Sequence, residues 1–315
     1  GADVAVGIYL TIAGCPMRDT IEGNTRAVLE ELDGVGDVTV TLHTMSDEQR
    51  RALALKLRGE QTGPAIPFAD PDTRTRIFAV ASGKGGVGKS SMTVNLATAL
   101  AAQGLSVGVV DADIYGHSVP GLMGSNDKGP TVVDEMIMPP IAHGVRHISV
   151  GQFVEGNAPI VWRGPMLTRA IQQFLADVYW GDLDVLFMDL PPGTGDVAIT
   201  VAQLVPNAEL LIVTTPQAAA AEVAERAGTI AQQTDQKIAG VIENMSGMTM
   251  PDGTVMNIFG EGGGEQVAER LTQLTDSDVK LLGSIPLDPK LREHGDTGTP
   301  VVISEPDSPA AKALQ

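Results

Sequence analysis

Residues 81–91 read Ala81-Ser82-Gly83-Lys84-Gly85-Gly86-Val87-Gly88-Lys89-Ser90-Ser91, and the rest of the chain is interpreted from them. From Gly83 to Ser90 they fit the spacing G-x-x-x-x-G-K-[ST] of a glycine-rich phosphate-binding loop. The apolar run 77–81 predicts a buried parallel strand before the loop, and apolar residues at helical spacing in 91–103 predict a helix after it. In this order, backbone N–H groups and the positive end of the helix converge on a phosphate.

Each position of the loop has an expected task. The glycines allow the backbone to approach phosphate oxygens that a side chain would keep away. Lys89 is expected to reach the β- and γ-phosphates, and the Ser90 hydroxyl to bind Mg²⁺. The predicted nucleotide-contacting set is Gly83, Lys84, Gly85, Gly86, Val87, Gly88, Lys89, Ser90 and Ser91.

The composition limits the classes of function. The chain has 315 residues, enough for a large and a small domain, and 43% of them are hydrophobic. Its formal net charge of -18 argues against binding to nucleic acid or an anionic membrane as the main activity. It contains no apolar run of membrane-spanning length, and its one cysteine excludes an intrachain disulfide and fits a reducing cytoplasm.

Aspartates follow two more predicted strands. The apolar run 107–110 leads to Asp111 and Asp113, and the run 185–188 leads to Asp189. Carboxylates at the carboxyl ends of parallel strands face the ligand crevice of an open sheet. Asp189 is therefore expected in the Mg²⁺ shell, whereas Asp111 and Asp113 have the alternative of capping a turn.

The chain is predicted to form two domains. Residues 1–58 alternate strand and helix patterns and predict a small α+β domain, in which Ser46 and Gln49 have the spacing of a capping box. Residues 59–76 are rich in proline, glycine and polar residues and predict a linker. Residues 77–315 predict an α/β domain with a doubly wound, mostly parallel sheet, in which 126–144 is an irregular surface insertion.

Several motifs resemble the Mrp/ApbC-type P-loop ATPases, which are iron–sulfur cluster carriers of the deviant Walker A class. The resemblance rests on K-G-G-x-G-K-S in the loop, W-R-G-P at 162–165, D-x-P-P-G-T-G-D at 189–196 and E-N-M at 243–245. It covers nearly the whole chain. It extends to Thr11-Ile12-Ala13-Gly14-Cys15-Pro16 and the Gly34-Val35 turn, which are similar to the iron–sulfur-assembly-like domain that precedes many such ATPases. That domain's first elements are expected to be missing here, with a clipped N-terminus.

The resemblance implies roles for individual residues. ATP binding would close a homodimer in which Lys84 reaches the partner's nucleotide, a cation that offsets charge during phosphoryl transfer. Asp113 would orient or activate the attacking water, and Asp111 would help to hold Mg²⁺. Asn244 would hydrogen-bond the adenine, beside a loop that starts at Pro286. Hydrolysis would reopen the dimer, and the implied partners are client apoproteins that receive clusters.

The chain departs from this family after E-N-M. Many members carry C-x-x-C there, but residues 246–256 contain no cysteine, and cluster iron is held chiefly by thiolates. This argues against a stable cluster at that segment, and the methionines there are interpreted as packing or interface residues. The remaining thiol, Cys15, is either a cluster ligand or a small residue buried in a turn.

Three functions follow from the sequence. The first is an ATP-hydrolysing iron–sulfur cluster carrier. The second is a positioning ATPase of the ParA or MinD type that binds DNA or membrane in its ATP state. The net charge disfavours that function, as does a tail, Ser308 to Gln315, that holds one basic residue and is too short for a membrane-binding amphipathic helix. The third is a nucleotide-gated adaptor that holds no cluster, which the missing cysteine pair keeps open.

Overall fold

The computed structural model describes residues 1–10, 18–32, 34–46, 48–49, 52–53, 66–70, 72–113, 116–133, 136–153, 164–193, 196–217, 220–250 and 252–315. The chain divides into two compact units. The smaller unit comprises residues 1–63 and 131–138, and the larger comprises 64–130 and 139–315. Cys15, the pair Trp162 and Arg163, and the pair Thr194 and Gly195 lie outside the described residues.

The small unit contains a parallel strand pair. Strand β1 (Ala2–Leu10) lies beside β2 (Val35–Thr44), and helix α1 (Arg18–Glu30) lies between them in the chain. Strands β5 (Thr131–Val133) and β6 (Met136–Met138) pair with each other in antiparallel fashion. The predicted capping box is confirmed, because the Ser46 N–H donates to Gln49 Oε1 at 2.9 Å and the Gln49 N–H donates to Ser46 Oγ at 3.2 Å.

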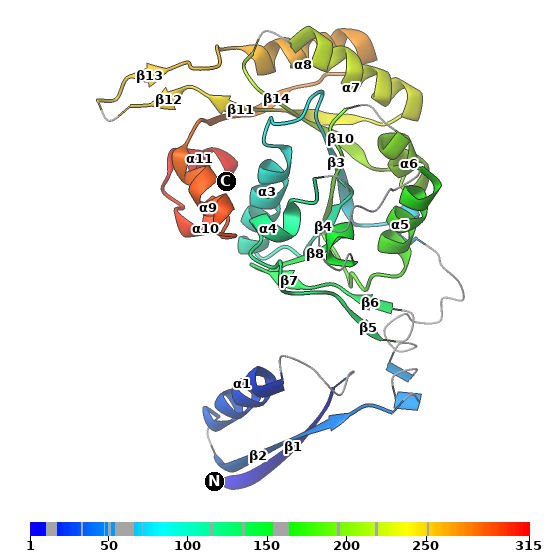
Figure 1. Cartoon of the computed structure of the whole chain (residues 1–315), viewed down its shortest axis with the longest axis vertical. Coiled ribbons are helices and arrows are strands. Elements are labelled where there is room, and N and C mark those ends of the chain that lie inside the picture. The colour runs from blue at the N-terminus through cyan, green and yellow to red at the C-terminus, as the bar shows by residue number, and fades with distance from the viewer. Residues whose placement is uncertain are drawn as a thin grey trace. The chain divides into compact units, whose positions relative to one another are not determined.

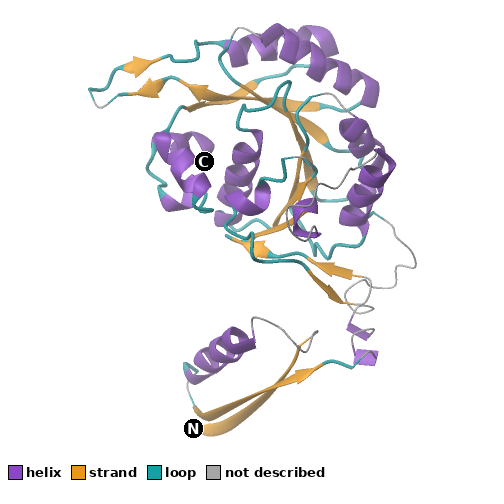
Figure 2. Ribbon diagram, viewed as in Figure 1, coloured by secondary structure: helices purple, strands orange, loops and turns teal. Residues whose placement is uncertain are grey.

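The large unit is built on an eight-stranded sheet with the order β14-β11-β10-β3-β9-β4-β8-β7 (Figures 1 and 2). All neighbouring strands in it are parallel except β7, which runs antiparallel to β8. The strands are β3 (Arg76–Ala81), β4 (Val107–Asp111), β7 (Ile141–Ala142), β8 (Val145–Ser149), β9 (Val185–Asp189), β10 (Glu209–Thr214), β11 (Ile238–Ser246) and β14 (Leu281–Pro286). A separate antiparallel pair consists of β12 (Met248–Thr249) and β13 (Val255–Met256).

Helices cover both faces of this sheet, so the predicted doubly wound α/β fold is confirmed (Figure 1). One face carries α3 (Lys89–Ala102), α4 (Val119–Leu122), α9 (Pro289–Asp296), α10 (Val301–Ser304) and α11 (Pro309–Leu314). The other carries α5 (Gly164–Ala176), α6 (Asp196–Leu204), α7 (Ala220–Thr234) and α8 (Gly263–Thr275). None of the described helices is long and apolar enough to cross a membrane.

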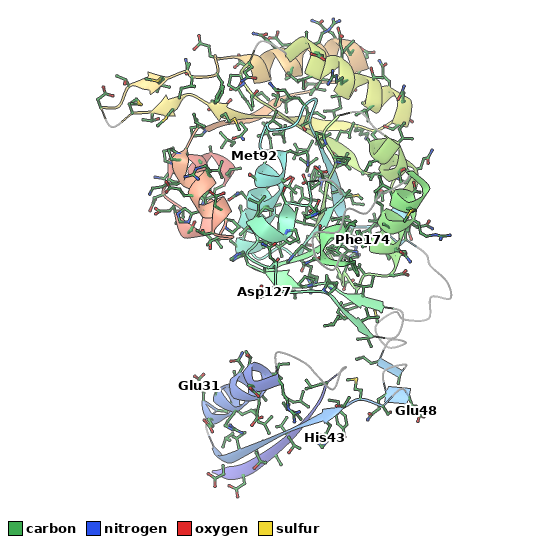
Figure 3. The ribbon with its side chains drawn as sticks, viewed as in Figure 1. Glu31, His43, Glu48, Met92, Asp127 and Phe174 are labelled. Carbon is green, nitrogen blue, oxygen red and sulfur yellow. The ribbon has the colours of Figure 1, made fainter. Side chains whose placement is uncertain are left out.

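Helix α3 is enclosed by protein. It packs on strands of the sheet and on α4, α10 and α11, and most of its first eleven residues are buried. Met92 is fully buried in this layer, and Phe174 lies on α5 at the opposite face of the sheet (Figure 3). A helix enclosed on several sides needs small or apolar residues around its circumference, which the sequence 89–102 supplies. This enclosure fixes the start of α3, and with it the end of the phosphate-binding loop.

Two sequence expectations require correction. Residues 126–144 were expected to be irregular, but they contain β5, β6 and β7, because runs of two or three apolar or β-branched residues suffice for short paired strands. The predicted linker 59–76 also contains ordered structure, since Pro67–Ala69 forms a 3-10 turn and Arg76 begins β3. Phe68 is 3% exposed and meets Trp180 edge to face, with ring centroids 6.5 Å apart.

Replacing Phe68 with alanine is expected to lower the free energy of unfolding by about 3–5 kcal/mol, because a buried aromatic side chain leaves a cavity when it is truncated. The matched control is Phe153→Ala, which removes a ring that is 45% exposed and stacked on Phe174, and should cost below about 1.5 kcal/mol. Urea titration of the full chain followed by circular dichroism measures both. Equal losses in the two variants would mean that Phe68 belongs to a linker after all.

Candidate nucleotide-binding site

The register of the sheet brings two aspartates to one edge. Asp111 ends β4, Asp189 ends β9, and the two residues are direct partners across these parallel strands. Val80 of β3 pairs with Asp189 from the other side, so the loop that follows β3 leaves the sheet beside both carboxylates. Asp111 is 1% exposed and Asp189 is 0% exposed. The topology therefore places two buried acids next to the glycine-rich loop, as the strand pattern predicts.

Asp189 is held by three side chains from the start of α3. The ammonium of Lys89 lies 2.6 Å from Asp189 Oδ1, and the Thr93 hydroxyl lies 3.0 Å from the same oxygen. The Ser90 hydroxyl donates to Asp189 Oδ2 at 2.5 Å. Lys89 is itself only 6% exposed, so this is a buried ion pair whose carboxylate has a partner on each oxygen.

Asp111 is a second acid in this buried environment. It accepts hydrogen bonds from the Ser149 hydroxyl at 3.0 Å, the Val119 N–H at 3.3 Å and the Asp113 N–H at 3.1 Å. Burial, with the negative charge of Asp189 beside it, raises the pKa of Asp111 to about 7. Two buried carboxyl groups side by side favour a cation next to them, and carboxylate and hydroxyl oxygens are the ligands that Mg²⁺ prefers. Asp111, Asp189 and Ser90 thus fit a magnesium site.

Asp113 is placed differently from the expectation for a water-activating residue. Its Oδ1 accepts the Gly116 N–H at 3.0 Å, and its backbone carbonyl accepts the same N–H at 3.2 Å. This is a side-chain-stabilised turn, the alternative that the sequence left open. Asp113 still lies two residues beyond Asp111, the last residue of β4, and its N–H donates to Asp111 Oδ1, but its own carboxylate accepts from Gly116.

Glycine is required at two loop positions for reasons that differ. Gly88 has φ +83, and a Cβ there would lie 2.3 Å from Nδ2 of Asn244. Gly83 has no left-handed backbone, but a Cβ there would lie 2.9 Å from the Cα of Val223 in α7. The first glycine therefore serves close packing of a helix on the loop, and the last serves a left-handed turn into α3.

Asn244 ties the loop to strand β11. Its amide Nδ2 donates to the Val87 carbonyl at 2.9 Å, and its Oδ1 is buried with no partner among the described residues. An unpaired buried amide oxygen is costly, and a donor on a ligand would satisfy it. Ile285 is the neighbour of Asn244 on β14, and Pro286 follows next to Ser246. The two residues expected near the base are thus on adjacent strands.

Lys84 contacts its own chain. Its ammonium donates to the Gln217 side chain, which follows β10 at the same edge of the sheet. Beside it, Arg226 of α7 donates to the Gly83 carbonyl at 2.8 Å. Sequence reasoning missed both partners. Gln217 could have been found, because Thr214-Thr215-Pro216-Gln217 ends a buried strand as the aspartate segments do. No sequence signal marks Arg226.

His147 was also missed. It is fully buried in β8, and its Nε2 lies 2.6 Å from the hydroxyl of Ser125, which follows α4. Burial lowers the pKa of His147 to about 4, so the imidazole is neutral at pH 7. Together with Ser149, which donates to Asp111, His147 holds the chain that follows the first aspartate segment against β8.

The segment after Asn244 forms a hairpin. Met248 of β12 faces Met256 of β13, and the Met256 side chain is 50% exposed. Within the described ranges, no three His, Cys, Asp or Glu side chains gather where they could hold a metal ion. Magnesium at the loop would therefore need oxygens from elsewhere, such as the phosphates of a nucleotide, to complete its shell.

Comparison with known proteins gives consistent matches. A family model described as "ParA: NUBPL iron-transfer P-loop NTPase" matches residues 73–315. An "Iron-sulfur cluster carrier protein" of Mycobacterium tuberculosis is 64% identical over 311 residues, which is 99% of this chain and 81% of that protein. One with the same name from Bacillus subtilis is 50% identical over 285 residues, or 90% of this chain and 77% of that protein.

Solved structures agree with these matches. A nucleotide-binding protein of Archaeoglobus fulgidus in complex with ADP is 33% identical, with a TM-score of 0.64 over 86% of this chain and 97% of that one. MinD of Pyrococcus horikoshii with Mg-ADP is 22% identical, with a TM-score of 0.53 over 76% of this chain and 93% of that one, and shares the fold.

The parallel sheet, the phosphate-binding loop and the paired aspartates define a nucleotide-binding P-loop NTPase. The 64% identity to the iron–sulfur cluster carrier protein of Mycobacterium tuberculosis, over nearly the whole chain, shows to which family of P-loop NTPases it belongs. The chain belongs to the family of ParA-type P-loop NTPases that carry iron–sulfur clusters, as its motifs predict.

Lowering the pH should weaken the fold through His147. Its folded-state pKa of about 4 lies below the ordinary value of 6.5, so the stability that the neutral ring contributes is complete above pH 6.5. It is lost as the pH falls toward 4, at about 1.4 kcal/mol per pH unit. His147→Gln should remove this component of the pH dependence, whereas His117→Gln, at an exposed position, should not. Urea midpoints between pH 4 and 7 test this, and parallel curves for wild type and His147→Gln would contradict it.

Proposed function

We propose that this chain binds ATP with Mg²⁺ in its glycine-rich loop and hydrolyses it in the cytoplasm while carrying iron–sulfur clusters to client apoproteins. The observation that carries the proposal is the contact of Lys89, Ser90 and Thr93 with Asp189 at the edge of the sheet. These are side chains of the kinds that bind phosphate and magnesium, joined directly in a member of a carrier family.

Nucleotide binding would replace the ion pair between Lys89 and Asp189. Lys89 exchanges Asp189 for the β- and γ-phosphates, while loop N–H groups donate to the same phosphates. Asp189 and Ser90, with Asp111 beside them, are then free to hold the metal. When bound, Mg²⁺ supplies positive charge that neutralises the phosphate oxygens. Asn244 offers its unpaired Oδ1 to the adenine amino group, with Pro286 beside the base.

Hydrolysis also needs a positioned water. Asp113 takes this role by exchanging the Gly116 N–H for the water molecule, which its carboxylate then orients or deprotonates. The glycine at position 116 leaves room for that change, because a Cβ there would lie 2.8 Å from Oδ2 of Asp113. The Asp113 carboxylate therefore has two positions. In one it accepts the Gly116 N–H, as in this structure, and in the other it orients the water.

Lys84, the lysine that the loop carries in addition to Lys89, supports a homodimer. Lys84 directly follows the first glycine of the loop. Its ammonium donates to the side chain of Gln217, and Gln217 is exposed to solvent. Release from Gln217 leaves the Lys84 ammonium free to reach the nucleotide of a second copy. A cation delivered in this way stabilises charge in the transition state of phosphoryl transfer.

Lys84→Ala should retain nucleotide binding but lose hydrolysis by about 10³-fold or more, because its ammonium acts on the transition state rather than on binding. Lys280→Ala, which removes a lysine whose side chain is 72% exposed, is the matched control. Phosphate release and sedimentation with a non-hydrolysable ATP analogue measure turnover and dimerisation. Turnover that is unchanged in Lys84→Ala, or equal in a strict monomer, would reject the role.

The cysteine content of the chain bears on its cargo. Relatives are named iron–sulfur cluster carriers, yet the hairpin β12–β13 has no thiolate to hold a cluster. Cys15 is the remaining thiol, so a cluster held by this protein would use Cys15, as one ligand from each copy of a dimer, with the other ligands from elsewhere. The same observation favours a second function, a nucleotide-gated adaptor that binds clients and holds no cluster.

Anaerobic reconstitution with iron and sulfide separates these functions. If Cys15 is a cluster ligand, the wild type should bind iron and sulfide and absorb visible light, and Cys15→Ala should lose most of both. A Cys15→Ser variant controls for side-chain volume. A wild type that takes up no iron while still hydrolysing ATP supports the adaptor, and equal iron in wild type and Cys15→Ala contradicts the assignment to Cys15.

A further inference from the structure

The structure assigns Thr93 a role as the positioning residue for Asp189, which holds the carboxylate in place when Lys89 leaves it. This inference rests on the proposed nucleotide and magnesium binding. Thr93 lies one turn after Lys89 in α3 and is 0% exposed. Its Oγ1 lies 3.0 Å from Asp189 Oδ1 and 3.0 Å from the Lys89 carbonyl.

Asp189 Oδ1 has two partners, Lys89 and Thr93, and nucleotide binding is expected to move only Lys89. Lys89 Nζ, at 2.6 Å, is the group that phosphates attract. Once it moves, Thr93 is the described side chain that still reaches Oδ1, while Ser90 faces Oδ2. A carboxylate buried this completely needs a donor, because an unpaired one pays the full cost of desolvation. The Thr93 hydroxyl has one proton, which it can give to the Lys89 carbonyl or to Asp189.

The backbone of α3 explains why this hydroxyl is well placed. Threonine is restricted at χ1, and one of its two helical rotamers points Oγ1 at the carbonyl four residues earlier. Among the residues that the structure describes, several other threonine hydroxyls make only that contact, for example those of Thr25, Thr229 and Thr275. Thr93 differs from them because a carboxylate of the site lies within hydrogen-bond distance of the same oxygen. The rotamer that the helix favours therefore also aims the hydroxyl at Asp189.

The expected consequence is a fixed direction for the metal-facing oxygen. With Oδ1 held by Thr93, the carboxylate keeps Oδ2 turned toward Ser90, where magnesium is proposed to bind. Residues that orient a metal ligand in this way typically change metal affinity by about 10- to 100-fold when they are replaced. Thr93 should thus affect the metal and leave the affinity for the metal-free nucleotide unchanged.

The test uses Mn²⁺ as the metal probe and ADP as the nucleotide, on the full chain. Free Mn²⁺ is measured by electron paramagnetic resonance, and ADP affinity without metal is measured in EDTA. Thr93→Val should weaken Mn²⁺ binding in the ADP complex by about 10- to 100-fold, and Thr93→Ser should restore it. The matched control is Thr98→Val in the same helix, a threonine that is also 0% exposed and whose hydroxyl has no partner among the described residues.

The outcomes are distinguishable. Wild-type Mn²⁺ affinity in Thr93→Val, or an equal loss in Thr98→Val, overturns the inference and leaves the proposed function standing. A wild type that shows no ADP-dependent Mn²⁺ binding overturns the proposed function and the inference with it. If circular dichroism shows that Thr93→Val does not fold, Thr93→Ala, which inserts no methyl group beside Asp189, replaces it in the same comparison with Thr93→Ser.

Discussion

The buried ion pair between Lys89 and Asp189 is the interaction on which the site depends. It joins the first residue of α3 to the last residue of β9, and neither side chain has meaningful access to solvent. Removing one member of such a pair leaves an uncompensated buried charge, which typically costs about 3–5 kcal/mol. The glycine-rich loop enters α3 at Lys89, so the pair also fixes where the loop ends. The end of the loop is therefore held by the same charges that would bind nucleotide and metal.

Much of this arrangement could be predicted, because it follows from strand patterns and one motif. Buried apolar runs that each end in an aspartate predict carboxylates at one edge of a parallel sheet, and the register places Asp111 directly beside Asp189. The apolar spacing in 91–103 predicts a helix directly after the loop, and α3 begins two residues earlier, at Lys89. The proximity of Lys89 to Asp189 is a consequence of these two facts.

The remainder depends on side chains that are distant in sequence. Asn244 reaches the Val87 carbonyl, Arg226 the Gly83 carbonyl and Lys84 the Gln217 side chain, and no periodicity encodes such pairs. The contact of Thr93 with Asp189 could not be predicted for a different reason. The sequence of a helix around a threonine is the same whether or not a carboxylate from another strand lies near its hydroxyl. Phe68 was assigned to a linker because proline and glycine are frequent in the sequence around it. Burial of its aromatic ring against Trp180 nevertheless holds this segment on the large unit.

The absence of cysteine from the hairpin bears on cargo without weakening the nucleotide site. Strand β11 carries Asn244 next to the loop and then leads, through Met245 with φ 60, to the hairpin β12–β13. The described contacts of Lys89, Asp189 and Asp111 come from α3, β8 and the chain after β4, and none of them passes through residues 246–256. The hairpin therefore contributes none of the described contacts that hold the buried charges beside the phosphate-binding loop.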